Sequence, residues 1–235
     1  VRLFDLVCTA TARLAASYLA AGFVHGVLNS DNIAISGESF DYGPWRFTPY
    51  WEPEFTAAYF DQTGLYAFGR QPEAIQWDVA QLAGCLTFLS EAAPLSDLLQ
   101  SWGDRFHAAL VEALLRRLGV ERRHPEEDRP LARALVGALA TKTVTIDRLF
   151  FDWRGGVVPD IATYEAEPFR ALAEALKGRA NPAARAHPYW QCEEPCSMFI
   201  DEVEAIWAPV AEADDWSHFE AKVAAIRTMG EAHTA

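Results

Sequence analysis

Side chains that could bind a metal ion and move a proton recur between residues 25 and 43. The run His25-Gly-Val-Leu-Asn-Ser-Asp-Asn32 is followed, nine residues after Asn32, by Asp41-Tyr-Gly43. The amide oxygen of Asn32 and the carboxylate of Asp41 are ligands that a hard cation prefers. If the two residues end adjacent strand-loop-strand segments, they can share one ion. The pattern therefore predicts a site for Mg²⁺ or Mn²⁺ at Asn32 and Asp41.

Protein kinases use the same two residue types, the Asn of the catalytic loop and the Asp of Asp-Phe-Gly. The kinase loop spans seven positions from its His to its Asn, and the same seven positions separate His25 from Asn32. The kinase base follows the His by two positions, where this chain has Val27, which accepts no proton. A carboxylate reappears at Asp31. The chain is therefore either a pseudokinase without a base, or an enzyme whose base has moved to serve a differently posed nucleotide.

The two motifs resemble those of the selenoprotein O family of protein adenylyltransferases. Residues 25–32 match the pattern His-Gly-Val-x-Asn-Ser/Thr-Asp-Asn, and residues 41–44 match Asp-Tyr-Gly-Pro. Residues 61–72 resemble the family's Asp-x-x-Gly-Arg-Tyr-Ala-Phe-x-x-Gln-Pro, and residues 77–83 resemble its next helix. Weaker similarity continues through residues 142–154, so that the resemblance covers about two thirds of the chain. The two site motifs together are specific, whereas either alone is a weak signal.

The resemblance implies a kinase-like fold that binds ATP in an inverted pose and transfers AMP to Ser, Thr or Tyr hydroxyls of proteins. Asp31 would be the catalytic proton acceptor, and Asn32 and Asp41 would hold the metal and, through it, ATP. Two departures stand out: Leu65 replaces a common Arg, and Trp45-Arg46 replaces Phe-Gly. The alternatives are a non-catalytic pseudokinase scaffold and an ordinary phosphotransferase.

The family's N-terminal lobe, with its glycine-rich turn, phosphate-binding Lys and partner Glu, has no counterpart before His25. The chain opens at Val1, without Met, directly in helical periodicity. We therefore expect a missing N-terminal lobe. Within this chain we expect two parts, a kinase-like C-terminal lobe over residues 1–156 and a helical C-terminal extension over residues 157–235.

Periodicity predicts a mainly α fold with a short β-hairpin at the active-site loop, and the family resemblance implies that this fold is like a kinase C-terminal lobe. A helix over residues 1–21 should end at Gly22, and short strands are expected at Phe23-Val24 and Ile33–Ile35. Residues 42–72 are aromatic-rich and irregular, and residues 122–128 and 178–195 read as loops. Further helices are expected over residues 74–90, 95–119 with a break near Trp102-Gly103, 130–141, 145–153, 168–176, 199–207 and 216–229.

Composition excludes several classes of protein. Of 235 residues, 51% are hydrophobic and 12% aromatic, enough for a folded core rather than a disordered chain. Lys and Arg number 20 against 33 Asp and Glu, and the net charge of −13 repels phosphate backbones, so no nucleic-acid partner is expected. We read no run of about 20 apolar residues and no signal peptide, which favours a cytoplasmic protein without a membrane partner.

Four further positions carry side chains that could have a catalytic or metal-binding role. His25 is expected to be a structural core residue rather than a proton carrier. Asp78 is either an exposed helix charge or a buried carboxylate that accepts backbone N–H groups from the catalytic loop. Cys192 and Cys196 lack the two-residue spacing of zinc and redox motifs, so a metal site there is a minor alternative. Two more cysteines, Cys8 and Cys85, are expected to be buried thiols.

Overall fold

The computed structural model describes residues 1–234 and is mainly helical. It contains nine α-helices and one two-stranded antiparallel sheet within this range. The mainly α class predicted from the sequence is therefore confirmed. The chain forms two compact units, one of residues Val1–Thr48 with Glu52–Ala113 and the other of Pro49–Trp51 with the residues from Leu114 onward. The division at residue 156 that we expect between functional parts stays a prediction.

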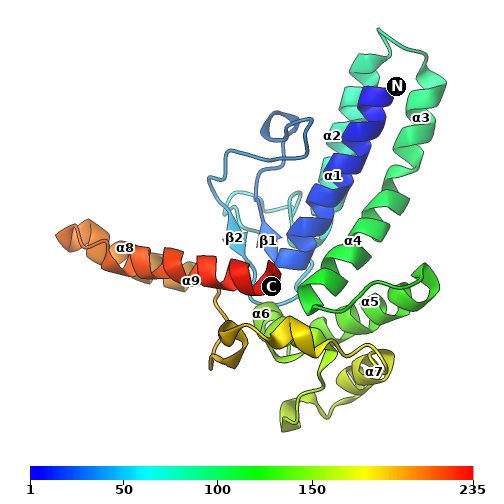
Figure 1. The fold of residues 1–235 in the computed structure, drawn as a ribbon. Helices are drawn as coiled ribbons and strands as arrows, with labels where there is room; N and C mark the ends of the chain where they lie inside the picture. Colours follow the sequence, from blue (N-terminus) through cyan, green and yellow to red (C-terminus); the bar gives the residue numbers. More distant parts are fainter. Residues whose placement is uncertain (235) are drawn as a thin grey trace. The chain divides into compact units, whose positions relative to one another are not determined.

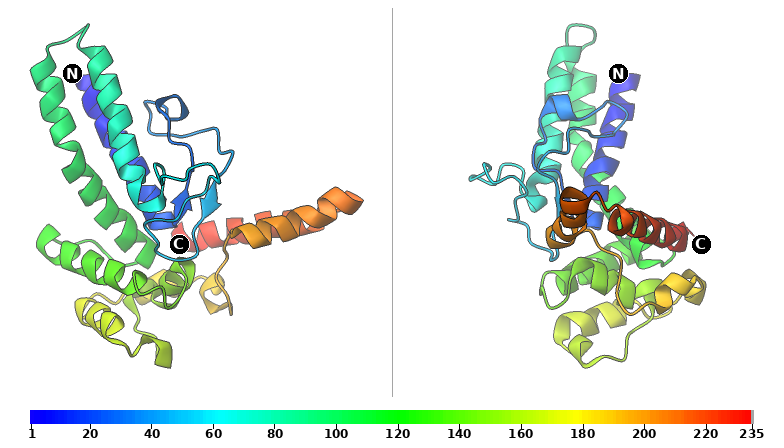
Figure 2. Two further views of the ribbon diagram at one scale, coloured as in Figure 1. Left: turned by 180° about the vertical axis from the view of Figure 1, so that it is seen from behind. Right: turned by 90° about the vertical axis from the view of Figure 1, so that its left-hand side faces the viewer.

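The first unit is built on α1 (Arg2–Ala21), which lies alongside α2 (Gln71–Leu86) in two views (Figures 1 and 2). Gly22 ends α1 as predicted, because its left-handed φ of 72° turns its N–H back to the carbonyl of Leu19. One stripe of α1 is buried, as expected for an amphipathic helix. Its apolar members are Phe4, Val7, Cys8, Ala12, Ala15, Ala16 and Leu19.

Two more helices complete this unit, α3 (Ala92–Gln100) and the first part of α4 (Trp102–Leu118), which continues into the second unit. The predicted break near Trp102 is confirmed. The buried indole of Trp102 donates to the hydroxyl of Thr11 at 3.0 Å. Arg105 pairs with Asp5 at 2.8 Å. Both contacts attach α4 to α1.

By length and composition, α1 is the one helix among residues 1–234 that could cross a membrane. It has 20 residues and a mean hydropathy of 1.2 over its most apolar window. More than half of that window, 56%, is buried inside the structure. Burial of this kind fits a core helix that packs against α2.

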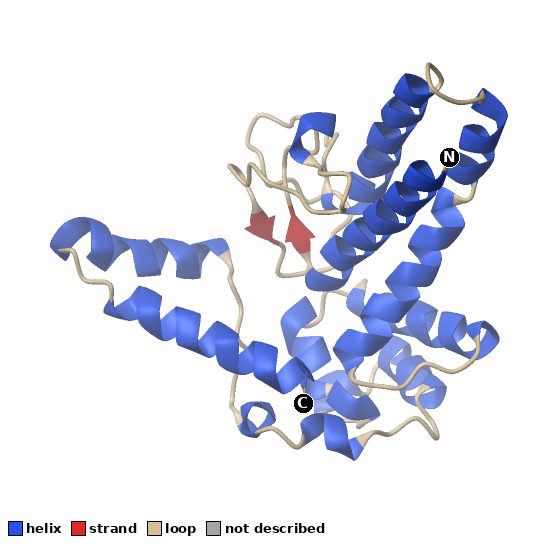
Figure 3. Ribbon diagram, turned by 45° about the horizontal axis from the view of Figure 1, so that its top comes forward, coloured by secondary structure: helices blue, strands red, loops and turns tan. Residues whose placement is uncertain are grey.

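The sheet consists of β1 (Phe23–Val24) and β2 (Arg46–Phe47), drawn in red in Figure 3, with Phe23 opposite Phe47. The expected strand at Ile33–Ile35 is wrong, since Ile33 makes only an isolated bridge to Ser39. Residues 33–39 fold back on themselves instead, with the N–H of Ala34 bonded to the carbonyl of Glu38 at 2.8 Å. The partner of β1 is therefore the later segment β2.

The second unit contains α5 (Pro125–Leu139), α6 (Ile146–Asp152) and α7 (Glu167–Ala175). α5 begins inside the charged segment that we predicted to be a loop. Pro125 suits the first helical position, and the acidic residues that follow it favour a helix N-terminus. A ring cluster supports α7, in which Tyr164 meets Trp153 edge-on at 5.5 Å and Phe169 at 5.0 Å.

Two antiparallel helices, α8 (Ile200–Ala213) and α9 (Ser217–Thr234), form a hairpin (Figure 3). Both run longer than the sequence predicted. Ala232 near the end of α9 is buried against Phe151, Tyr189 and Trp190. This contact joins the hairpin to the aromatic core of the second unit.

Candidate active site

One side chain, Gln71 at the first position of α2, holds β1 and the start of the loop that follows it through backbone hydrogen bonds. The backbone N–H of His25 donates to Oε1 of Gln71 at 2.9 Å, and Nε2 of Gln71 donates to the carbonyl of Phe23 at 2.9 Å. Gln71 is completely buried. This role was not predicted from the sequence, in which Gln71 stands directly before Pro72.

His25 connects the two motifs. Its ring is fully buried, and Nε2 lies 2.9 Å from the carbonyl of Phe40, the residue before Asp41. Since a carbonyl only accepts, Nε2 carries the proton and donates. Burial lowers the pKa of His25, with the Phe40 hydrogen bond and the charge of Asp41 acting against it. A neutral, buried and hydrogen-bonded imidazole has the structural role that we expected of it.

Gly26 explains why glycine follows that histidine. Its φ is +87°, a conformation that L side chains rarely adopt. A Cβ at this position would lie 2.8 Å from Cγ of Pro44. The His-Gly and Asp-Tyr-Gly-Pro motifs are therefore in direct contact, and a side chain at residue 26 would separate them.

The backbone brings Asn32 and Asp41 close together. The N–H of Phe40 donates to the carbonyl of Asn32 at 3.1 Å, so the residue next to Asp41 is hydrogen-bonded to Asn32 itself. Asn32 is buried, and its Nδ2 donates to the carbonyl of Val27 at 3.1 Å. This bond orients the amide and leaves its Oδ1 as the acceptor for another partner.

Asp41 is exposed and has a left-handed backbone, with φ of 58°. Asp and Asn tolerate this region better than most residues other than Gly. Strained backbone of this kind costs about 1–3 kcal/mol and is concentrated at functional sites. The conformation sets the direction of the chain where the predicted metal ligand stands.

Asp31 is exposed in the 3₁₀ turn η1 (Ser30–Asn32), next to the buried Asn32. A second carboxylate, Asp78 on α2, belongs to the same region of the unit. Burial, followed by the charge of Asp31, raises the pKa of Asp78 to about 7. Asp78 is buried, as in one of our two readings, but it accepts no hydrogen bond from the loop. Neither of its oxygens has a partner in the part of the chain that the structure describes.

The segment that begins at Asp61 contacts the loop of residues 25–32. Asp61 accepts the backbone N–H groups of Leu65 and Tyr66, both at 2.8 Å. The Tyr66 hydroxyl donates to Oδ1 of Asn29 at 2.5 Å. Burial raises the pKa of Tyr66, and the carboxylates Asp78, Asp61 and Asp31 raise it as well. The third matching stretch of sequence thus supports the loop that carries Asp31.

The four cysteines differ in their exposure. All four are free among the described residues, and Cys85 is exposed rather than buried, so that prediction was wrong, while Cys8 is buried as expected. Within residues 1–234, no group of three or more His, Cys, Asp or Glu side chains is arranged to hold a metal. A metal at Cys192 and Cys196 therefore finds no support.

Comparisons with known proteins agree with the motifs. The family model described as protein adenylyltransferase SelO matches residues 1–227. A protein named protein nucleotidyltransferase YdiU from Synechococcus sp. is 33% identical over 235 aligned residues, which cover 90% of this chain and 48% of that protein. A protein of the same name from Rhizobium johnstonii is 36% identical over 157 residues, covering 63% of this chain and 31% of its own length. The chain spans about half the length of the first of these relatives. It belongs to the SelO family of protein adenylyltransferases.

Proposed function

We propose that this chain carries the catalytic loop and the metal-binding residues of an enzyme that transfers AMP from ATP to Ser, Thr or Tyr hydroxyls of proteins. The observation that carries the proposal is the hydrogen bond from the N–H of Phe40 to the carbonyl of Asn32. This bond joins Asn32, which directly follows Asp31, to the residue that directly precedes Asp41. Family membership supplies the reaction class.

In the proposed reaction Asp31 is the general base. The protein hydroxyl loses its proton to the Asp31 carboxylate, and its oxygen forms a bond to the α-phosphorus of ATP. The bond from that phosphorus to the bridging oxygen breaks, and pyrophosphate leaves. Asp31 is exposed, so that an incoming hydroxyl can reach it. Val27 has no such role, and its carbonyl serves to orient Asn32.

The two ligands fit a divalent cation, Mg²⁺ or Mn²⁺. Asn32 has its Oδ1 left as an acceptor, and Asp41 presents an exposed carboxylate. Mg²⁺ is usually bound by one or two carboxylates together with substrate phosphates, so a site with few protein ligands suits it. Such an ion would neutralise charge on the ATP phosphates.

The finer assignments belong to the same proposal. Residues 1–156 would form a kinase-like C-terminal lobe, and residues 157–235 a helical extension. The order of elements in residues 2–43 supports the kinase-like lobe: a helix is followed by a loop, a short hairpin and the Asp-Tyr-Gly motif. The N-terminal lobe that the resemblance implies would supply cations for the ATP phosphates, and the partners would be ATP and protein substrates.

Labelled ATP tests the proposal on the product of the complete reading frame. Protein should retain label from the α position and none from the γ position. Label from the γ position alone would indicate an ordinary kinase, and no label with either ATP would indicate a scaffold.

Three variants sharpen the test. Asp31→Asn should lower the rate roughly 100-fold or more while ATP still binds. Asp41→Asn keeps a residue type that tolerates the left-handed backbone, and it should weaken metal-dependent ATP binding. Asp97→Asn, an exposed carboxylate on α3, is the matched control and should change neither.

A further inference from the structure

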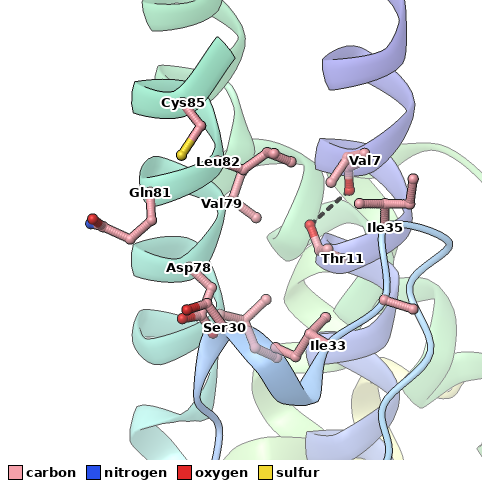
Figure 4. A pocket seen from close by; sticks show the side chains of 12 residues that line it. Val7, Thr11, Ser30, Ile33, Ile35, Asp78, Val79, Gln81, Leu82 and Cys85 are labelled. Carbon is pink, nitrogen blue, oxygen red and sulfur yellow. Dashed lines mark hydrogen bonds between the residues drawn. The ribbon is translucent and has the colours of Figure 1, made fainter.

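A pocket of about 250 Å³ lies in the first unit, beside the catalytic loop (Figure 4). Its walls come from α1, α2 and the segment after Asp31, and they are mostly apolar, with Val7, Ile33, Val79 and Leu82 among them. Its rim includes the exposed Cys85, so the pocket opens to solvent. Pockets that enclose a drug-sized ligand measure roughly 300–1,000 Å³, so this one suits a single side chain.

Among the described residues, Asp78 is the one charged group that lines the pocket. The carboxylate projects from α2 towards the loop that carries Ser30 (Figure 4). Asp78 is only 8% exposed, and both of its oxygens lack a hydrogen-bond partner among residues 1–234. Buried carboxylates are normally paired, because removing the charge from water is costly. The proposed AMP transfer uses Asp78 in no step, so a partner for its carboxylate would come from outside the described residues.

The walls of the pocket identify the kind of cation. The hydroxyl of Thr11 is already engaged, since it donates to the carbonyl of Val7 at 2.8 Å and accepts from Trp102. A metal ion would need oxygen ligands from several sides, whereas hydrocarbon surrounds much of this space. A Lys or Arg side chain satisfies both features, with an aliphatic stem for the walls and a cationic head for Asp78.

We propose that this pocket receives a Lys or Arg side chain of the protein substrate, and that Asp78 pairs with its charge. The inference rests on the proposed function. Ser30 lines the pocket and directly precedes Asp31, so the bound cation would lie close to the residue that takes the proton. The pocket would thereby select acceptor hydroxyls that have a basic residue nearby. The net charge of −13 favours the approach of a basic segment.

Paired peptides test the proposal on the product of the complete reading frame. Each peptide has one Ser and one Lys, with the Lys at successive positions on either side of the Ser. Its partner has norleucine in place of Lys, which keeps the stem and removes the charge. The wild type should show a KM at least about tenfold lower for the best Lys peptide than for its norleucine partner.

In Asp78→Asn this ratio should fall to about one, whereas the control Asp97→Asn should keep it. A preserved ratio in Asp78→Asn, or no Lys preference at any position in the wild type, would overturn the proposal. Absence of any AMP transfer, including self-labelling, would instead refute the proposed function. In that case fluorescence anisotropy measures binding of the same peptides to the pocket, which does not depend on AMP transfer. Equal binding of Lys and norleucine peptides would reject it.

Cys85 reports which occupant fills the pocket. The Lys peptide should slow alkylation of Cys85 in the wild type and leave it unchanged in Asp78→Asn. If Cys85 resists alkylation when no peptide is present, another segment of the protein fills the pocket, which would overturn the proposal. Loss of Lys-dependent binding in the presence of Mg²⁺ alone would assign the carboxylate to the metal and also overturn it.

Discussion

The unpaired carboxylate of Asp78 should make stability depend on pH in a direction opposite to that of most acids. Its pKa is raised from 3.8 to about 7 in the folded chain, first by burial and then by the charge of Asp31. A raised pKa means that the folded state binds this proton more tightly than the unfolded state. The contribution of Asp78 is therefore most favourable at or below pH 3.8, and it is progressively lost as the pH rises to 7.

The size of the effect follows from the two pKa values. About three pH units at roughly 1.4 kcal/mol each limit the total cost to about 4 kcal/mol. Of this, about 2 kcal/mol is already present at pH 5, because the unfolded carboxyl is ionised there. The remaining change between pH 5 and pH 8 is about 2.5 kcal/mol. The charge that acts on Asp78 is the carboxylate of Asp31, which disfavours ionisation.

Asp78→Asn keeps the shape of the side chain and removes its charge. Relative to wild type, the variant should gain about 2.5 kcal/mol in free energy of unfolding between pH 5 and pH 8. Urea denaturation at several pH values, with Asp97→Asn as the control, measures that gain. The amide introduced by Asp78→Asn would be unpaired as well, which changes the free energy of unfolding at every pH. The prediction therefore concerns how the difference between variant and wild type changes with pH, and not its value at one pH. A difference that stays constant over this range would show that Asp78 already has a cationic partner in the folded chain, and would refute the reasoning.

Three more variants test individual contacts by the same urea assay. Gln71→Leu leaves the buried N–H of His25 and the partly buried carbonyl of Phe23 without their Gln71 partner and should cost about 2–4 kcal/mol. Asp128→Ala removes the 2.7 Å partner of the buried Arg179 and should cost about 3–5 kcal/mol. Burial, followed by the charge of Arg154, lowers the pKa of His233 to about 4. The free energy of unfolding should therefore fall as the pH drops from 6.5 towards 4. His233→Gln should reduce that loss by about 1–2 kcal/mol.

Local signals in the sequence predicted most of what lies close together along the chain. Gly22 ends the first helix because its backbone conformation is a local property, and the break before Trp102 followed from periodicity. The approach of Asn32 to Asp41 was also predicted, since only a short hairpin separates them. Whether these residues bind a metal stays a prediction.

Features that depend on distant segments were missed. The pairing of Phe23 with Phe47 crosses the whole catalytic loop, and nothing in the short apolar piece at Ile33 distinguishes it from a strand. The exposure of Cys85 could not be read from helical periodicity, because Cys85 follows the buried Asp78 by seven residues and lies on nearly the same face of α2. The role of Gln71 was invisible because its two partners lie 46 and 48 residues earlier in the sequence.

The carboxylates of the first unit differ in burial, and their proposed roles differ accordingly. Asp31 is exposed, and a proton acceptor must be reachable by its substrate. Asp78 is buried and unpaired, which disfavours its own charge until a cation arrives. In the proposed reaction, ATP would bring further negative charge to the same region. Binding of a divalent ion at Asn32 and Asp41 and of a basic substrate residue at Asp78 would each lower the repulsion. The two binding events should therefore favour each other, and a substrate without a basic residue should bind less tightly even when metal and ATP are saturating.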